Sequence, residues 1–290
     1  MATPASMCGL RPLLLSFGAS RRTFGRVASE RLSSPITLSP HMTARATRGV
    51  LENIDLLVCD MAGTVVQEGG LVYRTLQLCM QEHGLQVADD EMHPWHGAKK
   101  EAVIEHFARK AKIPDGELEQ KIQVIGDAFV NSIDEAYFAE ASPIGHIDIG
   151  LMGYFKQLKE AGVKLAFNTG YPRSIQEGLI KRLNFDQVVD AYISSYDVKE
   201  GRPYPYMIHR LMEELHIENV RRVAKVGDSV RDIEEGRNAG CGLVVGVLSG
   251  ADSASELFAA GADMVANCVT DLPIPRKPVR LAKLRLPDLS

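Results

Sequence analysis

The segment Asp60-Met-Ala-Gly-Thr64 combines a carboxylate and a hydroxyl in one short turn. Residues 54–59, which precede it, are apolar and β-prone, and this pattern predicts a buried parallel strand. Open α/β sheets bind ligands at the carboxyl ends of such strands. Asp60 is therefore expected to act as a nucleophile toward phosphorus, with the Thr64 hydroxyl in the same turn. Ala62 can neither donate nor accept a proton, so it cannot assist an oxygen leaving group.

Further polar residues follow predicted strands or occupy the connections between them. These segments are residues 163–168 leading into Thr169-Gly-Tyr171, the stretch Gly201-Arg-Pro-Tyr-Pro205, and residues 222–227 leading into Asp228 and Asp232. A lone Gly-Asp-x-x-x-Asp pattern is usually a turn with a helix cap, so one segment by itself is weak. The occurrence of all of them in order, most at strand ends, favours a common site.

In this order the segments resemble the four motifs of the haloacid dehalogenase superfamily. The resemblance implies a doubly wound, Rossmann-like parallel sheet and catalysis of phosphoryl transfer. It implies the following roles: Asp60 as the nucleophile, Thr169 and Arg202 as ligands of the phosphoryl group, and Asp228 and Asp232 as the acidic fourth motif. Phosphatases of the superfamily usually carry a second Asp in the first motif, which protonates the leaving oxygen, where this chain has Ala62.

Within the superfamily the motifs look most like those of the phosphonatase family. That family has Ala in the first motif, Thr-Gly-Tyr in the second and Gly-Arg-Pro-x-Pro in the third. The similarity covers roughly residues 52–250 and is strongest over 197–250. A lysine three residues after a glycine forms a Schiff base in that family, which here matches Lys100 after Gly97.

A Schiff base on Lys100 would explain Ala62. A protonated imine withdraws electrons from the neighbouring carbon, so that a C–P bond can break with carbon leaving as an enamine. No oxygen then needs a proton. The resemblance therefore predicts cleavage of phosphonoacetaldehyde to acetaldehyde and phosphate, and the alternative is a phosphatase acting on a small phosphate monoester, with Lys100 as a charge contact.

Imine chemistry requires Lys100 to be neutral part of the time, whereas the pKa of a free lysine is about 10.4. Desolvation, or a cation such as Lys99 or His96, would lower this pKa. The alternative is that Lys99 and Lys100 form a solvated pair on a helix. The chain departs from the family at two cap positions, with His96 in place of Met and Val103 in place of His, and His106 lies one helical turn further on.

The carboxylates predict a Mg²⁺ site. Asp60, Asp228 and the backbone carbonyl of Ala62 form an all-oxygen ligand set, which suits Mg²⁺. Asp232 is expected to orient these ligands from behind. Lys225 lies in a predicted strand, where its alkyl chain could pack with the amine at the surface.

The substrate is expected to be small, and a homodimer joined through the cap is implied by the resemblance. Residues predicted to bind the substrate are Ala62, Thr64, His96, Gly170 and Tyr171. His83 and His93 lack ligand-like spacing to carboxylates or cysteines, which indicates surface or packing roles.

Composition agrees with one enzyme domain and its appendages. The 290 residues are 45% hydrophobic, with a net charge of −4 that gives no reason to expect a nucleic acid partner. No apolar run approaches the roughly 20 residues of a membrane helix. The five cysteines form no CxxC pair, and Cys59 and Cys241 fall in or beside predicted strands, so reduced core thiols are expected.

Both ends are expected to lie outside the enzyme domain. Residues 1–48 are rich in Arg and Ser and contain one acid, Glu30, which predicts a mitochondrial or plastid transit peptide. The alternatives are a disordered basic tail, or a cytosolic form that starts at Met42. Residues 273–290 are expected to form a flexible basic tail.

The predicted topology is an α/β core interrupted by a helical cap. The core comprises residues 49–70 and 145–272, and the cap comprises residues 71–144. Core strands are expected near 54–59, 163–168, 189–194, 222–227 and 243–248, and core helices near 150–161, 172–183, 203–216 and 230–239. A cap inserted after the first motif could close over the site and exclude water.

Overall fold

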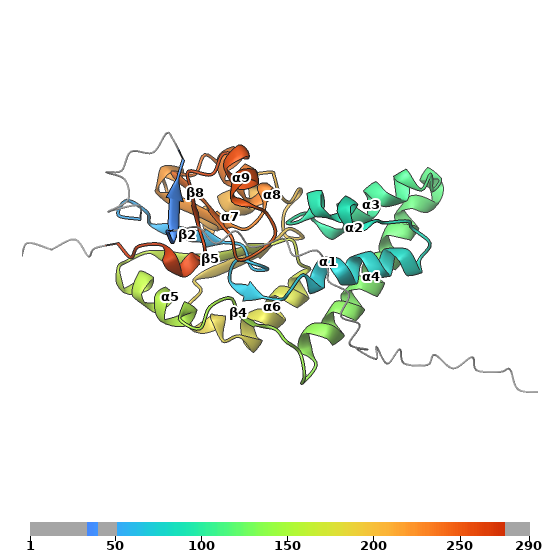
Figure 1. Ribbon diagram of the computed structural model, residues 1–290, viewed down its shortest axis with the longest axis horizontal. Coiled ribbons are helices and arrows are strands. Elements are labelled where there is room, and N and C mark those ends of the chain that lie inside the picture. Colours follow the sequence, from blue (N-terminus) through green and yellow to red (C-terminus); the bar gives the residue numbers. More distant parts are fainter. Residues whose placement is uncertain (1–33, 40–50, 276–290) are drawn as a thin grey trace, which may run out of the picture.

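The computed structural model describes residues 34–39 and 51–275, and in them a seven-stranded sheet forms the core (Figure 1). Its strand order is β1-β9-β8-β7-β2-β5-β6, and every neighbouring pair is parallel except β1 with β9. The strands are β1 Ile36–Leu38, β2 Leu56–Cys59, β5 Lys164–Thr169, β6 Ala191–Ser194, β7 Val223–Gly227, β8 Leu243–Val247 and β9 Met264–Ala266.

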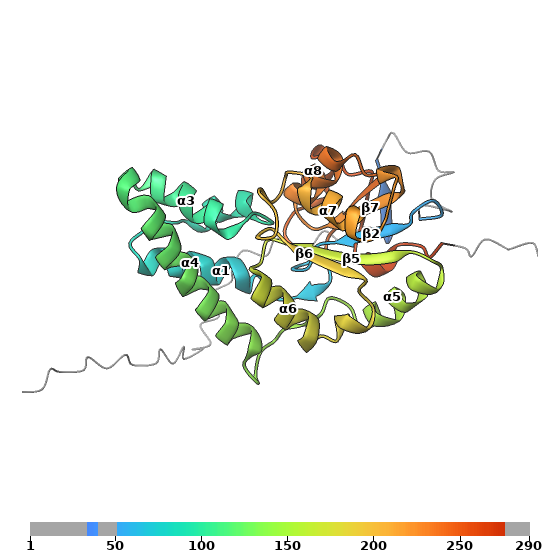
Figure 2. The same cartoon turned by 180° about the vertical axis from the view of Figure 1, so that it is seen from behind.

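Helices cover both faces of this sheet, as the alternation of side chains along a strand requires. In the fully buried β2, Leu57 and Cys59 pack into one apolar cluster with α5 (Leu151–Glu160) and α6 (Arg173–Arg182). Leu56 and Val58 pack into a second cluster on the opposite face. That face carries α7 Tyr206–Glu214, α8 Val230–Ala239 and α9 Ala254–Ala259. Figure 2 shows α7 and α8 on one side of β5 and β6, and α5 and α6 on the other.

The remaining helices form the cap, which lies to one side of the sheet (Figures 1 and 2). They are α1 Leu71–Glu82, α2 Asp89–Met92, the 3₁₀ helix η2 His93–Trp95, α3 Lys100–Lys110 and α4 Asp115–Phe138. The chain enters the cap after β3 (Val66–Gln67) and returns to the core through β4 (Gly145–His146), and these two strands pair antiparallel. The two crossings between core and cap are thus joined by backbone hydrogen bonds.

The α/β fold class is confirmed, and the predicted core strands and helices are present, with their ends shifted by three residues at most. The sequence did not predict the short elements. These are β1, β3, β4, β9, α9 and the 3₁₀ helices η3 Phe185–Gln187, η4 Val220–Arg222 and η5 Val269–Asp271. None of the helices in the described residues has the length and apolarity that a membrane span needs.

Strand β1 falls inside the segment expected to be a transit peptide. Thr37 pairs with Val265, so residues 36–38 form the antiparallel edge of the core sheet. Apart from residues 34–39, the predicted leader lies outside the described part of the chain. Residues 276–290 of the predicted tail also lie outside it.

Candidate active site

The carboxyl ends of β2, β5 and β7 meet at one edge of the sheet. Asp60 follows β2, Thr169 ends β5, and Asp228 follows β7 directly after Gly227. Since β2 is hydrogen-bonded to both other strands, these side chains gather at one place. A cavity of about 660 Å³ opens there between core and cap. Of the residues predicted for the site, its lining includes Asp60, Ala62, His96, Lys100, Thr169, Gly170, Tyr171, Arg202 and Asp228.

Thr64 and Asp232 stand behind the cavity wall rather than in it. Thr64 is fully buried, and its hydroxyl donates to Asp228 Oδ1 at 3.2 Å. Asp232 is also fully buried; its Oδ2 accepts from the Ser229 hydroxyl at 2.6 Å, while its Oδ1 pairs with Arg202 and Lys225. Both residues therefore fix the position of site groups through hydrogen bonds and ion pairs. The sequence predicts that Thr64 contacts the substrate directly, and this geometry does not favour that contact.

Arg202 is held by partners on three sides. Its Nη1 lies 2.7 Å from Asp60 Oδ1, and its Nη2 donates to the backbone and side-chain oxygens of Asn168, both at 2.8 Å. Its Nε lies 3.1 Å from both Asp232 Oδ1 and Glu235 Oε2. A guanidinium carries two N–H groups on each terminal nitrogen. Among the described residues Nη1 has one partner, so its second N–H is available to a phosphoryl oxygen in the cavity.

Lys225 joins the same buried network, so the expectation of an amine at the surface is wrong. Its Nζ lies 2.6 Å from Asn168 Oδ1, 2.9 Å from Asp232 Oδ1 and 3.3 Å from Glu235 Oε2, and the side chain is fully buried. The strand pattern predicts burial at this position, but not the acids that meet the amine. Those acids come from α8, and Asn168 comes from β5, which is separated from β7 by β2 in the sheet.

The carboxylates fit a divalent cation. Ligand oxygens of Asp60, Asp228 and Asp232 lie within 4.8 Å of one another, and all three side chains are buried. Burial raises the pKa of Asp60 to about 6, against the opposing effect of Arg202. Burial also raises the pKa of Asp228, and the charges of Asp60 and Asp232 raise it further. Such mutual repulsion is what a bound cation relieves.

Asp232 differs from the other two carboxylates because cations already neutralise it. Burial by itself would raise its pKa, but Arg202 and Lys225 bring that pKa below the usual range. With both oxygens engaged, Asp232 orients the cluster. Asp60 and Asp228 are the residues whose carboxylates face the cavity and could hold Mg²⁺.

Lys100 is buried inside the cavity wall, so the alternative of a solvated lysine pair is wrong for this residue. It is the first residue of α3 and is 3% exposed. Burial lowers its pKa to about 8; the charge of Asp60 opposes this, and the charge of Arg202 lowers the pKa further. A cation is also disfavoured at a helix N-terminus. Lys99 does not contribute as expected, since its Nζ lies over the Tyr196 ring, 4.9 Å from the centroid.

Tyr73 is a site residue that the sequence did not reveal. Its hydroxyl oxygen accepts from Lys100 Nζ at 3.1 Å and from the backbone N–H of Gly97. Lys100 Nζ also lies 4.4 Å from the centre of the Tyr73 ring. Burial raises the pKa of Tyr73, so its hydroxyl stays protonated. In sequence Tyr73 is one aromatic residue of an amphipathic helix, and only the fold brings it to Lys100.

A pair of hydrogen-bonded tyrosines extends from the cavity into the cap. The hydroxyls of Tyr171 and Tyr137 are 2.7 Å apart, and the Tyr137 hydroxyl donates to Glu68 Oε2 at 3.0 Å. Glu68 also accepts from the backbone N–H groups of Gly70, the N-cap of α1, and of Val72 in its first turn. Tyr171, predicted from the second motif, is therefore fixed at the cavity wall by a hydrogen-bonded chain.

Two glycines allow the cap to contact the core closely. A Cβ on Gly170 would lie 2.7 Å from the backbone oxygen of Ala98, and a Cβ on Gly97 would lie 2.7 Å from Ser229 Oγ. Gly97 also has φ +77°, a conformation that L side chains rarely adopt. The turn before Lys100 is thus pressed against the loop that follows Thr169.

The two departures from the phosphonatase pattern have separate environments. His96 lines the cavity and its ring lies against Tyr73, tilted by 31°, with ring centroids 4.2 Å apart. Val103 is fully buried in the apolar core of the cap. His106 does not take the place of a histidine at 103, because its ring lies against Trp95 at 4.7 Å and is absent from the cavity lining.

Comparison with known proteins gives relatives consistent with this geometry. A family model described as haloacid dehalogenase-like hydrolase matches residues 54–240. A phosphonoacetaldehyde hydrolase of Bacillus cereus strain ATCC 14579 is 30% identical over 209 residues, covering 68% of this chain and 76% of the relative. The protein of that name from Lysinibacillus sphaericus is 29% identical over 211 residues, with the same coverage of each chain.

Solved structures share the fold. A phosphonoacetaldehyde hydrolase-like protein from Oleispira antarctica superposes with a TM-score of 0.64 at 22% identity, covering 77% of this chain and 91% of that one. A predicted phosphoglycolate phosphatase from Haemophilus somnus superposes with a TM-score of 0.60 at 17% identity, covering 76% and 96%. The same architecture thus occurs in proteins named for different substrates.

Proposed function

Since this chain belongs to the haloacid dehalogenase-like hydrolases, we propose that it cleaves the C–P bond of a small phosphonate aldehyde. Phosphonoacetaldehyde, named by its relatives, is the proposed substrate. The observation that supports this choice is the buried Lys100, with its lowered pKa, in the cavity that also contains Asp60 and Ala62. A lysine of this kind is suited to imine formation.

The proposed reaction has two covalent stages. The neutral amine of Lys100 condenses with the aldehyde to give an imine and water, and the imine is protonated. The Asp60 carboxylate then attacks phosphorus, and the electrons of the C–P bond move to carbon to form an enamine. Water hydrolyses the aspartyl-phosphate to phosphate, and protonation and hydrolysis of the enamine release acetaldehyde and Lys100. No step needs an acid at Ala62.

The phosphoryl end of the substrate would contact groups at the sheet edge. The available N–H of Arg202 Nη1 and the hydroxyl of Thr169 lie on the cavity wall, where they can bind phosphoryl oxygens. Mg²⁺ would be held by Asp60, Asp228 and the backbone carbonyl of Ala62, and it would reduce repulsion between the carboxylates and the anionic substrate. Chelation by EDTA is therefore expected to stop phosphate release, and added Mg²⁺ to restore it.

Borohydride trapping tests the proposal. The purified protein is incubated with phosphonoacetaldehyde and borohydride, and its peptides are analysed by mass spectrometry. Trapping is expected on Lys100 in the wild type and in Lys99→Met, and not in Lys100→Met. Lys99→Met is a matched control, because it removes the adjacent lysine, whose amine lies over Tyr196.

The alternative function is hydrolysis of a small phosphate monoester. The apolar environment of Val103, where phosphonatases carry histidine, is the observation that favours it. In that case Lys100→Met would retain phosphate release from a monoester, and no adduct would form on Lys100. Assays of the wild type, Lys99→Met and Lys100→Met against a panel of phosphonates and phosphate monoesters separate the two activities.

We also propose the location and assembly that the sequence predicts. Residues 1–48 fused to a reporter are expected to direct it to an organelle, and a diffuse cytosolic signal would contradict this. A homodimer through the cap is expected to give a dimer mass by light scattering, and a monomer mass would count against it.

A further inference from the structure

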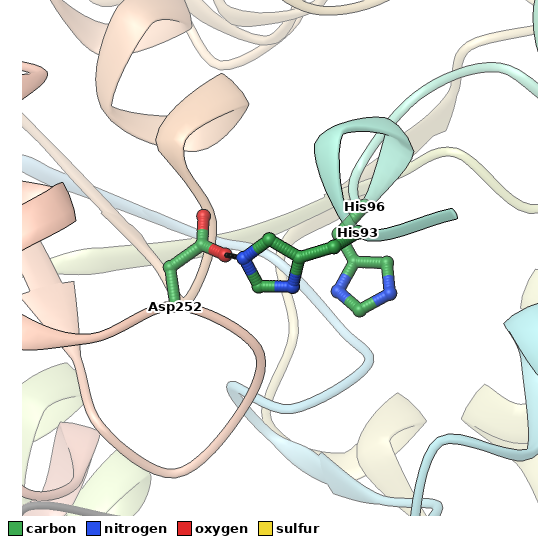
Figure 3. Close-up of side chains that lie close together, drawn as sticks. All are labelled: His93, His96 and Asp252. Carbon is green, nitrogen blue, oxygen red and sulfur yellow. Dashed lines mark ion pairs between the residues drawn. The ribbon is translucent and has the colours of Figure 1, made fainter. Parts of the chain in front are cut away.

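Two histidines of the cap, which also line the cavity, meet one carboxylate of the core (Figure 3). His93 is the first residue of the 3₁₀ helix η2, and His96 directly follows that helix. Asp252 lies in the loop between β8 and α9. One ligand atom from each residue lies within 4.8 Å of the others. We propose that these residues bind a divalent transition metal ion, with Zn²⁺ as the reference ion, between cap and core.

The distances bring donor atoms of both kinds together. His93 Nε2 lies 3.2 Å from Asp252 Oδ1 and 3.4 Å from Glu256 Oε1. The rings of His93 and His96 are 5.3 Å apart, and Figure 3 shows a ring nitrogen of His96 turned toward the His93 ring. Glu256 lies at the edge of the cluster, where its other carboxylate oxygen, Oε2, accepts from the Ser253 hydroxyl at 2.6 Å.

An unpartnered nitrogen supports a ligand at this place. His96 Nδ1 is buried and has no hydrogen-bond partner among the described residues. A buried polar atom without a partner is costly, and a metal ion is one way to satisfy it. A neutral imidazole binds a metal ion through its unprotonated ring nitrogen, and Nδ1 of His96 is free to take that role among the described residues.

The local backbone explains why the two histidines face one side. A 3₁₀ helix has three residues per turn, so residues i and i+3 such as His93 and His96 project in similar directions. Two imidazoles and carboxylates form the mixed nitrogen and oxygen set of Zn²⁺ sites. The cluster of Asp60 and Asp228 offers oxygens alone, which suits Mg²⁺. The chemistry of the donors thus separates the two sites.

A metal ion here would tie the cap to the loops that hold Asp228. Asp252 Oδ2 accepts from the Val230 N–H at 2.6 Å, and the Asp252 N–H donates to the Asp228 backbone oxygen at 3.0 Å. The same cap turn already contacts α8, since Arg231 Nε donates to the Pro94 backbone oxygen at 3.2 Å. An ion bound by His93 and Asp252 would oppose separation of cap and core.

Cobalt binding tests this proposal without an activity assay. The full chain is titrated with Co²⁺ in excess Mg²⁺, and its visible absorption is recorded. A single equivalent of Co²⁺ is expected to give the d–d bands of a nitrogen-containing site, and Zn²⁺ is expected to remove those bands by competition. His93→Asn is expected to abolish the bands, and it is expected to fold because His93 has 37% of its side chain exposed.

Two further variants distinguish the sites. His83→Asn is the matched control, because His83 contacts the Cys79 backbone oxygen in α1, and it is expected to retain the bands. Asp228→Asn weakens the Mg²⁺ site and is also expected to retain them. Zn²⁺ is expected to raise the Tm of the wild type and not that of His93→Asn. Bands that persist in His93→Asn, or that vanish only in Asp228→Asn, would overturn the proposal, as would their absence from the wild type.

Discussion

The Nζ atom of Lys100 donates a hydrogen bond to the hydroxyl oxygen of Tyr73, 3.1 Å away. The same oxygen accepts from the Gly97 N–H, so both contacts leave the hydroxyl proton of Tyr73 unused. Tyr73 comes from α1 and Lys100 from α3, and the contact therefore depends on how the cap helices pack. In the proposed reaction this proton can reach the oxygen that leaves as water when the imine forms.

We predict that Tyr73→Phe slows imine formation about 100-fold, because a positioned proton donor is worth roughly 10²–10⁴-fold. The rate of borohydride trapping on Lys100 measures this step directly. Tyr204→Phe is the control, since Tyr204 is 50% exposed. Equal trapping rates in Tyr73→Phe and wild type would show that Tyr73 only packs against the lysine.

The pH dependence of trapping is expected to follow Lys100. Burial lowers its pKa to about 8. The neutral amine is the reactive form, so the trapping rate should rise as the pH increases toward 8 and level off above it. A lysine with an ordinary pKa would instead give a rate that still rises at pH 9 to 10, near the free value of about 10.4. Trapping at constant aldehyde and borohydride from pH 6 to 10 distinguishes the two profiles.

Asp60→Asn is expected to lower phosphate release by at least about 10³-fold, as loss of a nucleophile does in other covalent enzymes. The fold should persist, because Asn has nearly the same volume and Arg202 keeps Asp232 and Glu235 as partners. Circular dichroism and Tm check the fold. Asp186→Asn, at an exposed position, is the control. Undiminished turnover in Asp60→Asn would end the assignment of the nucleophile.

Lys225→Met is expected to reduce the free energy of unfolding by about 3–5 kcal/mol, because it leaves buried carboxylates with one cation fewer. Those carboxylates belong to Asp232 and Glu235. Lys159→Met removes a pair with Asp190 at the surface and should cost about 0–1 kcal/mol. Urea unfolding measures both variants, and a similar small loss in each would contradict the role given to the buried network.

The core strands were predictable because their apolar runs are short and each ends in a polar residue. Residues 54–59 and Asp60 show this, and β2 ends at Cys59 as expected. Strands β3 and β4 have two residues each, too short for a periodic pattern, and they form only because the cap crossings meet. Strand β1 lies in an Arg- and Ser-rich segment whose composition gives no sign of a sheet edge, and its pairing with β9 is a tertiary contact.

The site was predictable where motif residues follow strands. Asp60, Thr169 and Asp228 reach one place because parallel strands share an edge. Residues that depend on helix packing or distant partners were not predictable. Tyr73 and Glu235 show no local pattern that distinguishes them from other helical residues, yet one contacts Lys100 and the other pairs with Arg202.

The close contact between cap and core at Gly170 is expected to hold Lys100 in position. Gly170 touches the cap turn, and an added Cβ would lie 2.7 Å from the Ala98 backbone oxygen. Gly170→Ala should therefore push the turn away from the core and displace Lys100 from Asp60, lowering kcat/KM by about 10²-fold, the loss expected for a misplacement of about 1 Å. The clash is confined to the contact between cap and core, so the Tm should change little. Gly153→Ala in α5, where an added Cβ meets nothing within 4 Å, should leave activity unchanged. Wild-type activity in Gly170→Ala would show that the cap need not approach the core this closely.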